Sequence, residues 1–226
     1  RTIGLYLISL DKGERSFSYW RGQSAAKTLA NDPDRLDAAM AEADVIYFSG
    51  ITLAILDAEQ RAVLLSSLRD ARRQGKAIAF DPNLRPKLWV SSEEMTNAIM
   101  QGAAVSDIVL PSFEDEASWF EDATPEATAN RYLNVGATTI VVKNGEAPVL
   151  YAEGSQIGEV PVVPVSNVID TTAAGDSFNA GVFAGHAMGM SLHNGITYAC
   201  SLSREVVQKK GALVDINPAA LLVKSV

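Results

Sequence analysis

Residues 170–181 read Asp170-Thr171-Thr172-Ala173-Ala174-Gly175-Asp176-Ser177-Phe178-Asn179-Ala180-Gly181. The small residues at 173–175 allow a tight turn, and Phe178, Val182 and Phe183 follow with helical spacing. The stretch therefore predicts a turn that opens into a helix. Amides at a helix start have no partner within the helix, and the helix dipole favours negative charge there. We expect a phosphate at this turn, with Asp176 near enough to accept a proton from an attacking hydroxyl. A simple capping role for Asp176 is the alternative.

Upstream of this turn, short apolar runs alternate with helical patterns. The runs cover residues 44–49, 77–81, 107–110 and 139–143, and their composition is typical of strands buried on both faces of a sheet. One helical stretch carries apolar residues at Ala62, Leu65, Leu68 and Ala71 and ends at Gly75, where a C-cap is expected. Alternating strands and helices predict an α/β fold with a mostly parallel sheet.

The two ends of the chain differ from this middle. Residues 3–10 and 16–20 flank turn residues and predict a β-hairpin. Two further strands are expected at residues 148–152 and 159–165, and a long helical half from Asp176 onward. In open α/β sheets, ligands bind beyond the carboxyl ends of the strands, so the residues after each run are candidates for a site.

Composition narrows the class of protein. The chain has 226 residues, a length that suits one domain, and carries 27 acidic against 19 basic residues. This balance argues against nucleic acid as a partner. No apolar run is long enough for a membrane helix, so we expect a cytoplasmic protein without membrane contact. The single cysteine, Cys200, is expected to pack rather than react. A strand is already under way at Ile3, which suggests a piece of a longer product.

The string at 170–181 resembles the signature of the pfkB (ribokinase-like) carbohydrate kinase family, Asp-Thr-Thr-Gly-Ala-Gly-Asp-x-Phe-x-x-Gly. Ala173 stands where most members have glycine, a departure common among 2-keto-3-deoxygluconate kinases. The resemblance implies a three-layer ribokinase-like fold over residues 1–226, without its N-terminal segment, and a lid hairpin at 1–22. It also implies that Asp176 is the catalytic base and that the amides of Ala173, Ala174, Gly175 and Asp176 form an anion hole.

Substrate contacts are expected on the hairpin. Phe17, Tyr19 and Arg21 alternate and share one face of a strand, and Tyr6 joins them if the register allows. Arg85 follows the run at 77–81, in extended chain before Pro86. Together Arg21 and Arg85 would form a fork for a carboxylate, which favours a sugar acid. The alternatives are an aromatic edge surface and an Arg85–Asp81 loop brace.

The nucleotide side rests on shorter resemblances. Phe80-Asp81-Pro82-Asn83-Leu84-Arg85 resembles the family's F-D-x-N-x-R element, and residues 143–145 resemble its K-x-G turn. Ser112 occupies the asparagine position of N-x-x-E, and Asp115 the glutamate position. These imply nucleotide contacts at Asn83, Ser112, Lys143 and Gly145, and Mg²⁺ held through water by Asp115. In some relatives a monovalent cation binds near Asp170, and we leave that open.

The sequence thus predicts an ATP- and Mg²⁺-dependent kinase that phosphorylates the terminal hydroxyl of 2-keto-3-deoxygluconate (2-dehydro-3-deoxygluconate). The galactonate epimer is not distinguished. A kinase of a neutral sugar or nucleoside such as ribose, fructose or adenosine is the alternative, and a sugar-binding regulator without turnover is another. An NAD-binding oxidoreductase is set aside, because no G-x-G-x-x-G follows a strand. Exposed lid edges favour a homo-oligomer.

Overall fold

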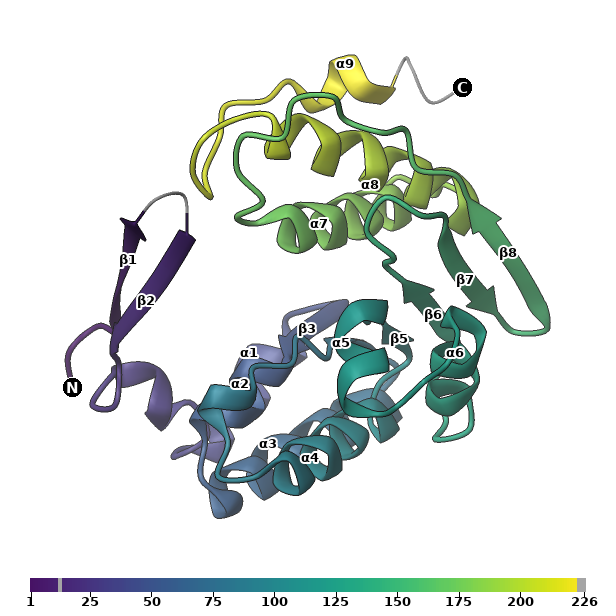
Figure 1. Cartoon of the computed structure of the whole chain (residues 1–226). Helices are drawn as coiled ribbons and strands as arrows, with labels where there is room; N and C mark the ends of the chain where they lie inside the picture. The colour runs from purple at the N-terminus through teal and green to yellow at the C-terminus, as the bar shows by residue number, and fades with distance from the viewer. Residues whose placement is uncertain (12–13, 223–226) are drawn as a thin grey trace. The chain divides into compact units, whose positions relative to one another are not determined.

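The computed structural model describes residues 1–11 and 14–222, which form two compact units, Arg1–Asp107 and Ile108–Val226 (Figure 1). Each unit contains a pair of parallel strands together with helices. Within the described residues, none of the helices has the length and apolar character required to cross a bilayer.

The first unit contains the predicted hairpin and the first two predicted buried strands. Its elements are β1 (Leu5–Asp11), β2 (Glu14–Trp20), η1 (Ala25–Thr28), α1 (Pro33–Ala41), β3 (Val45–Ser49), α2 (Gly50–Ile55), α3 (Ala58–Arg73), β4 (Ala77–Asp81), η2 (Pro86–Leu88) and α4 (Ser92–Ala104). β1 and β2 pair antiparallel, whereas β3 and β4 pair parallel. The hairpin and both strands are confirmed, and the tip at residues 12–13 lies outside the described residues.

Helix α3 has the end signals and most of the buried face that the sequence pattern predicts. Asp57 accepts a hydrogen bond from the Gln60 amide at its start, and Gly75, with φ of 87°, follows its end as predicted. Leu65, Leu68 and Ala71 are buried, whereas Ala62 is exposed. The predicted buried face is therefore correct at its last three positions.

Gly50 brings helix α2 into close contact with the loop after β4. A methyl group built on Gly50 would lie 1.9 Å from the Pro82 carbonyl oxygen and 2.7 Å from Ile99 Cδ1. Both neighbours belong to the same unit, and the nearest is backbone that cannot rotate away. Only glycine fits there without moving residues 81–85.

Substitution Gly50→Ala is expected to lower the free energy of unfolding by about 1–3 kcal/mol, the usual cost of overpacking a core. Gly22→Ala is the control, because nothing lies within 4 Å of a methyl group at that exposed position. Urea unfolding of both variants measures the difference. Equal stability of the two would contradict the close approach.

The second unit carries the other strands and the helical C-terminal half. Its elements are β5 (Ile108–Val109), α5 (Phe113–Trp119), α6 (Pro125–Leu133), β6 (Thr139–Val142), β7 (Val149–Glu153), β8 (Gln156–Val160), α7 (Ala174–Ala187), α8 (Leu192–Val207) and α9 (Pro218–Leu222). β5 and β6 are parallel, and β6, β7 and β8 form antiparallel neighbours in that order.

The last strand differs from its prediction. A strand was expected at residues 159–165, but β8 covers Gln156–Val160. Gly154, with φ of 59°, makes a tight turn, so β8 starts three residues earlier. Pro161 follows at once and cannot donate to a strand ladder. The Val-Pro-Val-Val-Pro-Val run over 160–165 therefore looks strand-like but is mostly irregular chain.

Helices α7 and α8 lie side by side (Figure 1) and cover the core of this unit. A methyl group on Gly181 would lie 2.5 Å from Ala199 Cα, so the two helices approach closely at that point. Buried Phe178, Val182 and Ile196 pack with Val141 of β6 in one cluster. This packing attaches the start of α7 to the end of the sheet.

Candidate active site

The predicted turn at 173–175 exists and opens into α7. Ala173 caps the helix in the left-handed region, with φ of 62° and ψ of 16°, and α7 begins at Ala174. The first hydrogen bond of the helix runs from the Ser177 amide to the Ala173 carbonyl at 2.9 Å. The amides of Gly175 and Asp176 lie before that bond, in the part of a helix that has no intrahelical acceptor. The left-handed φ also explains why glycine suits position 173 in the family signature.

One part of the predicted anion hole is already engaged. The Ala174 amide donates to the Thr171 carbonyl at 3.2 Å within the turn. Of the predicted donors, the amides of Ala173, Gly175 and Asp176 therefore remain candidates. Asp176 is the third residue of α7, and its side chain is exposed.

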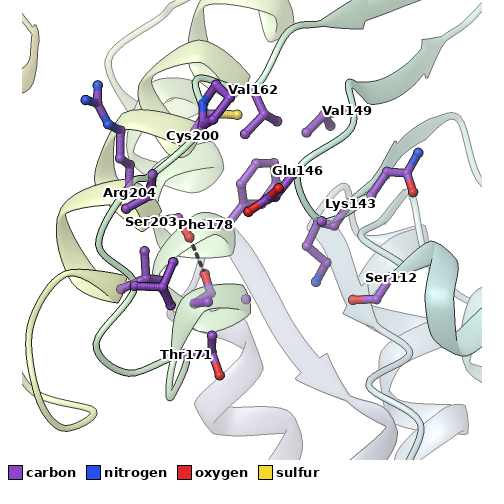
Figure 2. Close-up of a pocket in the computed structure, with 18 of the residues that line it drawn as sticks. Ser112, Lys143, Glu146, Val149, Val162, Thr171, Phe178, Cys200, Ser203 and Arg204 are labelled. Atoms are coloured by element: carbon purple, nitrogen blue, oxygen red, sulfur yellow. Dashed lines mark hydrogen bonds between the residues drawn. The ribbon is translucent and has the colours of Figure 1, made fainter.

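Several hydrogen bonds hold this turn against the end of α8. Asp170 accepts from the Thr172 amide at 2.8 Å and from the Gly211 amide at 3.0 Å. Ser203 on α8 donates to the Ala174 carbonyl at 3.0 Å, shown dashed in Figure 2. The turn is thus fixed from both sides before any ligand binds, which reduces the reorganisation required during reaction.

Lys143 lies at the same place, at the end of β6. Its Nζ donates to Asn179 Oδ1 of α7 at 3.2 Å, and a methyl group on Gly175 would lie 3.9 Å from it. The Lys143 backbone also bonds to the α5 entry, accepting from the Phe113 amide at 2.8 Å. Ser112 and Lys143 form a bridge between these segments, and Gly145 turns the chain with φ of 60°.

A pocket of about 660 Å³ adjoins the turn, within the second unit (Figure 2). Apolar side chains, including Val149, Val162 and Phe178, form one wall, while Lys143 and Thr171 lie toward another part. Such a pocket suits a flat apolar group joined to an anion. The predicted residues it brings together are Ser112, Lys143, Gly145, Ala174 and Gly175.

The acids at the start of α5 differ in position. Glu114 lines the pocket, and Asp115 is half-buried in the same first turn, its amide donating to the Ser112 carbonyl at 3.0 Å. Among residues 1–11 and 14–222, no group of three or more His, Cys, Asp or Glu side chains is arranged to hold a metal ion. A cation at this position would therefore take most of its ligands from phosphate and water.

Glu116, the next acid, is fully buried and belongs to a separate network. Its Oε2 accepts from Arg131 at 2.7 Å and from the Tyr132 hydroxyl at 2.9 Å, and Arg131 also pairs with Asp122 at 2.6 Å. Its Oε1 is buried without a hydrogen-bond partner in the described chain. Burial raises the pKa of Glu116 from 4.5 to about 7, against the opposing effect of Arg131. The network ties α5, whose first turn lines the pocket, to α6.

This raised pKa predicts a pH-dependent stability. Between pH 4.5 and 7 the unfolded chain loses the Glu116 proton while the folded chain keeps it, so stability falls as pH rises through this window. Substitution Glu116→Gln removes that contribution, and its stability relative to the wild type is expected to improve between pH 5 and pH 8. Urea unfolding at both pH values measures the change. Parallel pH dependences of the two proteins would contradict it.

On the hairpin of the first unit, the structure brings three predicted substrate contacts together. Tyr6 and Tyr19 are direct cross-strand partners with ring centroids 6.4 Å apart. The Arg21 guanidinium lies 4.4 Å from the Tyr19 ring centroid. Arg21 Nε is buried without a hydrogen-bond partner among the described residues. A donor in this state is open to a ligand acceptor. The side chain of Phe17 lies outside the description.

The loop after β4 is not extended as predicted. Asn83 has φ of 36°, because its amide donates to the Asp81 carboxylate at 3.1 Å and closes a local turn. Arg85 is exposed and donates to the Leu84 carbonyl at 2.9 Å.

Known proteins resemble the chain over nearly its whole length. The model of the pfkB family carbohydrate kinases matches residues 1–220. The chain belongs to the pfkB family of carbohydrate kinases. It is 41% identical over 217 residues to the 2-dehydro-3-deoxygluconokinase of Haemophilus influenzae, covering 94% of this chain and 69% of that protein.

Solved structures agree with this membership. A PfkB protein from Polaromonas sp. JS666 has a TM-score of 0.81 at 28% identity, covering 96% of this chain and 69% of that one. A fructokinase from Xylella fastidiosa with bound ATP has a TM-score of 0.78 at 26% identity, covering 92% and 68%. The predicted α/β ribokinase-like fold with a mostly parallel sheet and a small hairpin is confirmed, as is the prediction of a sugar kinase.

Sequence reasoning missed part of the pocket of this pfkB kinase. The lining residues not predicted include Glu114, Glu146, Cys200, Ser203 and Arg204. Cys200 packs against the core, and burial raises the pKa of its thiol to about 11, which supports the predicted packing role. Residues 200–204 lie on α8, far from any signature, so no sequence signal connects them to the pocket.

Proposed function

We propose that this pfkB kinase transfers the γ-phosphoryl group of ATP to the terminal hydroxyl of 2-keto-3-deoxygluconate. The observation that carries the proposal is the start of α7, where a left-handed Ala173 presents the helix N-terminus beside the Lys143 ammonium. Such an arrangement favours an anion through both the helix dipole and the full charge. The 2-dehydro-3-deoxygluconokinase of Haemophilus influenzae supports the choice of acceptor.

In the proposed reaction, Asp176 accepts the proton of the attacking hydroxyl. A bond forms between that oxygen and the γ-phosphorus, the bond to the β,γ-bridging oxygen breaks, and ADP leaves. The amides of Gly175 and Asp176 and the Lys143 ammonium stabilise the charge on the transferring group. Positioning and charge supply most of the catalysis in phosphoryl transfer, so few side chains are needed.

We place the nucleotide in the pocket of the second unit. Its apolar wall suits the adenine ring of a nucleotide. The fructokinase from Xylella fastidiosa with bound ATP supports the choice of nucleotide. Ser112, Lys143 and Gly145 are the proposed contacts in this pocket, and the nucleotide contact at Asn83 stays a prediction. The residues present fit Mg²⁺ carried on the phosphates, with Asp115 acting through water. Bound there, Mg²⁺ would neutralise phosphate charge. A monovalent-cation site near Asp170 stays a prediction.

For the acceptor, we propose that Arg21, with Arg85, binds the carboxylate and that Tyr6 and Tyr19 contact the sugar. The unpartnered Nε of Arg21 supports this, since a carboxylate would satisfy a donor that is otherwise buried at a cost. Residues 1–22 would then form the lid of a single kinase domain.

We also propose a homo-oligomer formed through the hairpin, where Leu5, Leu7 and Trp20 are more than half exposed. Light scattering of the wild type and of a Leu5→Lys, Leu7→Lys variant tests it. A monomeric wild type would contradict the proposal.

The cytoplasmic location stays a prediction.

The substrate is tested by ADP release from the full-length protein with magnesium-ATP against 2-keto-3-deoxygluconate, ribose, fructose and adenosine. We expect the sugar acid to be turned over far better than the neutral compounds. If a neutral sugar or the nucleoside is preferred, the kinase assignment holds and the Arg21–Arg85 carboxylate fork is wrong. If none yields ADP, a sugar-binding regulator becomes the better description.

A further inference from the structure

Asn179 is a buried polar side chain that the reaction outlined above does not use. It lies on α7, one turn beyond Asp176, and only 2% of its surface is exposed. Its Oδ1 accepts the hydrogen bond from Lys143 Nζ at 3.2 Å. Lys143 in turn lies beside Gly175, at the helix start. One buried amide therefore connects the helix interior to the cation at its N-terminus.

The acceptor of the Lys143 ammonium is a neutral amide oxygen, and this affects the charge that Lys143 presents. Lysine has a flexible side chain, and holding its ammonium at one point costs conformational entropy unless a fixed partner receives it. A carboxylate would also fix the ammonium, but its negative charge would offset the positive charge of the ammonium. An amide oxygen fixes it and leaves the positive charge in place. The backbone of Asn179 is rigid within α7, so its side chain starts from a fixed point.

We propose that Asn179 is a positioning residue, which holds the Lys143 ammonium beside Gly175 with its charge intact so that it stabilises the transferring phosphoryl group. This inference rests on the proposed phosphoryl transfer. Charge develops on the phosphoryl oxygens in the transition state, and a fixed cation there lowers the barrier more than a mobile one. A packing role for Asn179 alone is the competing explanation, and it predicts effects on stability but not on catalysis.

The first experiment compares Asn179→Asp and Asn179→Leu with the wild type and with Lys143→Met in steady-state kinetics. Asn179→Asp keeps the shape but neutralises Lys143, and we expect it to lower kcat by about tenfold or more with the KM for the sugar little changed. Asn194→Asp, the same change at an exposed position on α8, is the matched control and should be as active as the wild type. Full kcat in Asn179→Asp would overturn the proposal.

A double-mutant cycle separates positioning from packing. If Asn179 acts through Lys143, then Asn179→Leu lowers kcat in the wild type but has little further effect in the Lys143→Met background. Independent roles predict losses that add on a logarithmic scale, and that result would overturn the proposal. Urea unfolding of each variant, measured in parallel, identifies any loss of kcat that arises from a smaller folded fraction.

A binding measurement keeps this inference distinguishable from the proposed function. Calorimetry with ATP and with adenosine compares a ligand that has phosphates with one that lacks them. We expect Asn179→Asp and Lys143→Met to weaken ATP binding by about tenfold relative to adenosine. If the wild type shows no turnover but this difference is found, the transfer reaction fails while the positioning of Lys143 stands. Equal effects on ATP and adenosine would overturn the positioning role.

Discussion

Asp176→Asn is expected to lower kcat by roughly 10²–10⁴-fold, the usual contribution of a general base, while ATP and sugar still bind. Asparagine keeps the size and hydrogen-bonding reach of the side chain but cannot accept the proton. The side chain is exposed in the first turn of α7, so the substitution should leave the fold unchanged. Single-turnover ADP formation and nucleotide affinity, measured on the same preparation, separate the two effects.

His186→Asn is the control for this experiment, because His186 is exposed in the last turn of the same helix and has no proposed role. It should match the wild type in both measurements. If Asp176→Asn retains wild-type kcat, Asp176 is a helix-capping acid only, and the base must be sought elsewhere. If it loses nucleotide binding as well as turnover, the anion site rather than proton transfer has been disturbed.

Arg131→Met is expected to lower the free energy of unfolding by about 3–5 kcal/mol at pH 8, because it leaves buried carboxylates without their cation. Glu116 has no exposed surface, and its Oε2 receives Arg131 at 2.7 Å. Methionine keeps much of the volume that stacks on Phe120, so the lost charge dominates. Urea unfolding monitored by fluorescence measures the change.

Three further measurements test that explanation. Arg73→Met removes an ion pair with Asp70 at 2.8 Å that is mostly exposed, and it should cost less than about 1 kcal/mol. Adding Glu116→Gln to Arg131→Met should recover part of the loss, since a neutral amide is cheaper to bury. Lowering the pH to 5.5 should do the same by protonating Glu116. A loss that neither change reduces would show that packing around Arg131 matters more than charge.

The network around Glu116 illustrates what sequence reasoning overlooks. Glu114, Asp115 and Glu116 form one acidic run, in which the sequence predicts a metal role for Asp115 only. In the fold, Glu114 lines the pocket, Asp115 is half-buried and Glu116 is fully buried against α6. Helical rotation by about 100° per residue sends neighbours to different surroundings, and only the partner helix determines what each one meets.

The predicted conformation of the loop after β4 was wrong for a different reason. Pro86 restricts Arg85, which was read correctly as non-helical, but the turn at Asn83 depends on a hydrogen bond to the Asp81 side chain. Asparagine tolerates a positive φ better than most residues, yet nothing local requires it to adopt one. Local propensity alone therefore left the conformation open.

By itself the sequence determined the order of the elements, the turn at 173–175 and the family, because strand burial, helix periodicity and small residues at a turn are local and periodic. Only the tertiary structure decided that Lys143 and Asn179, 36 positions apart, share a hydrogen bond, and that α8 contributes a wall of the pocket. Such contacts arise when β6, α7 and α8 pack together. Their geometry depends on side-chain volumes from distant segments, which no short stretch of sequence records.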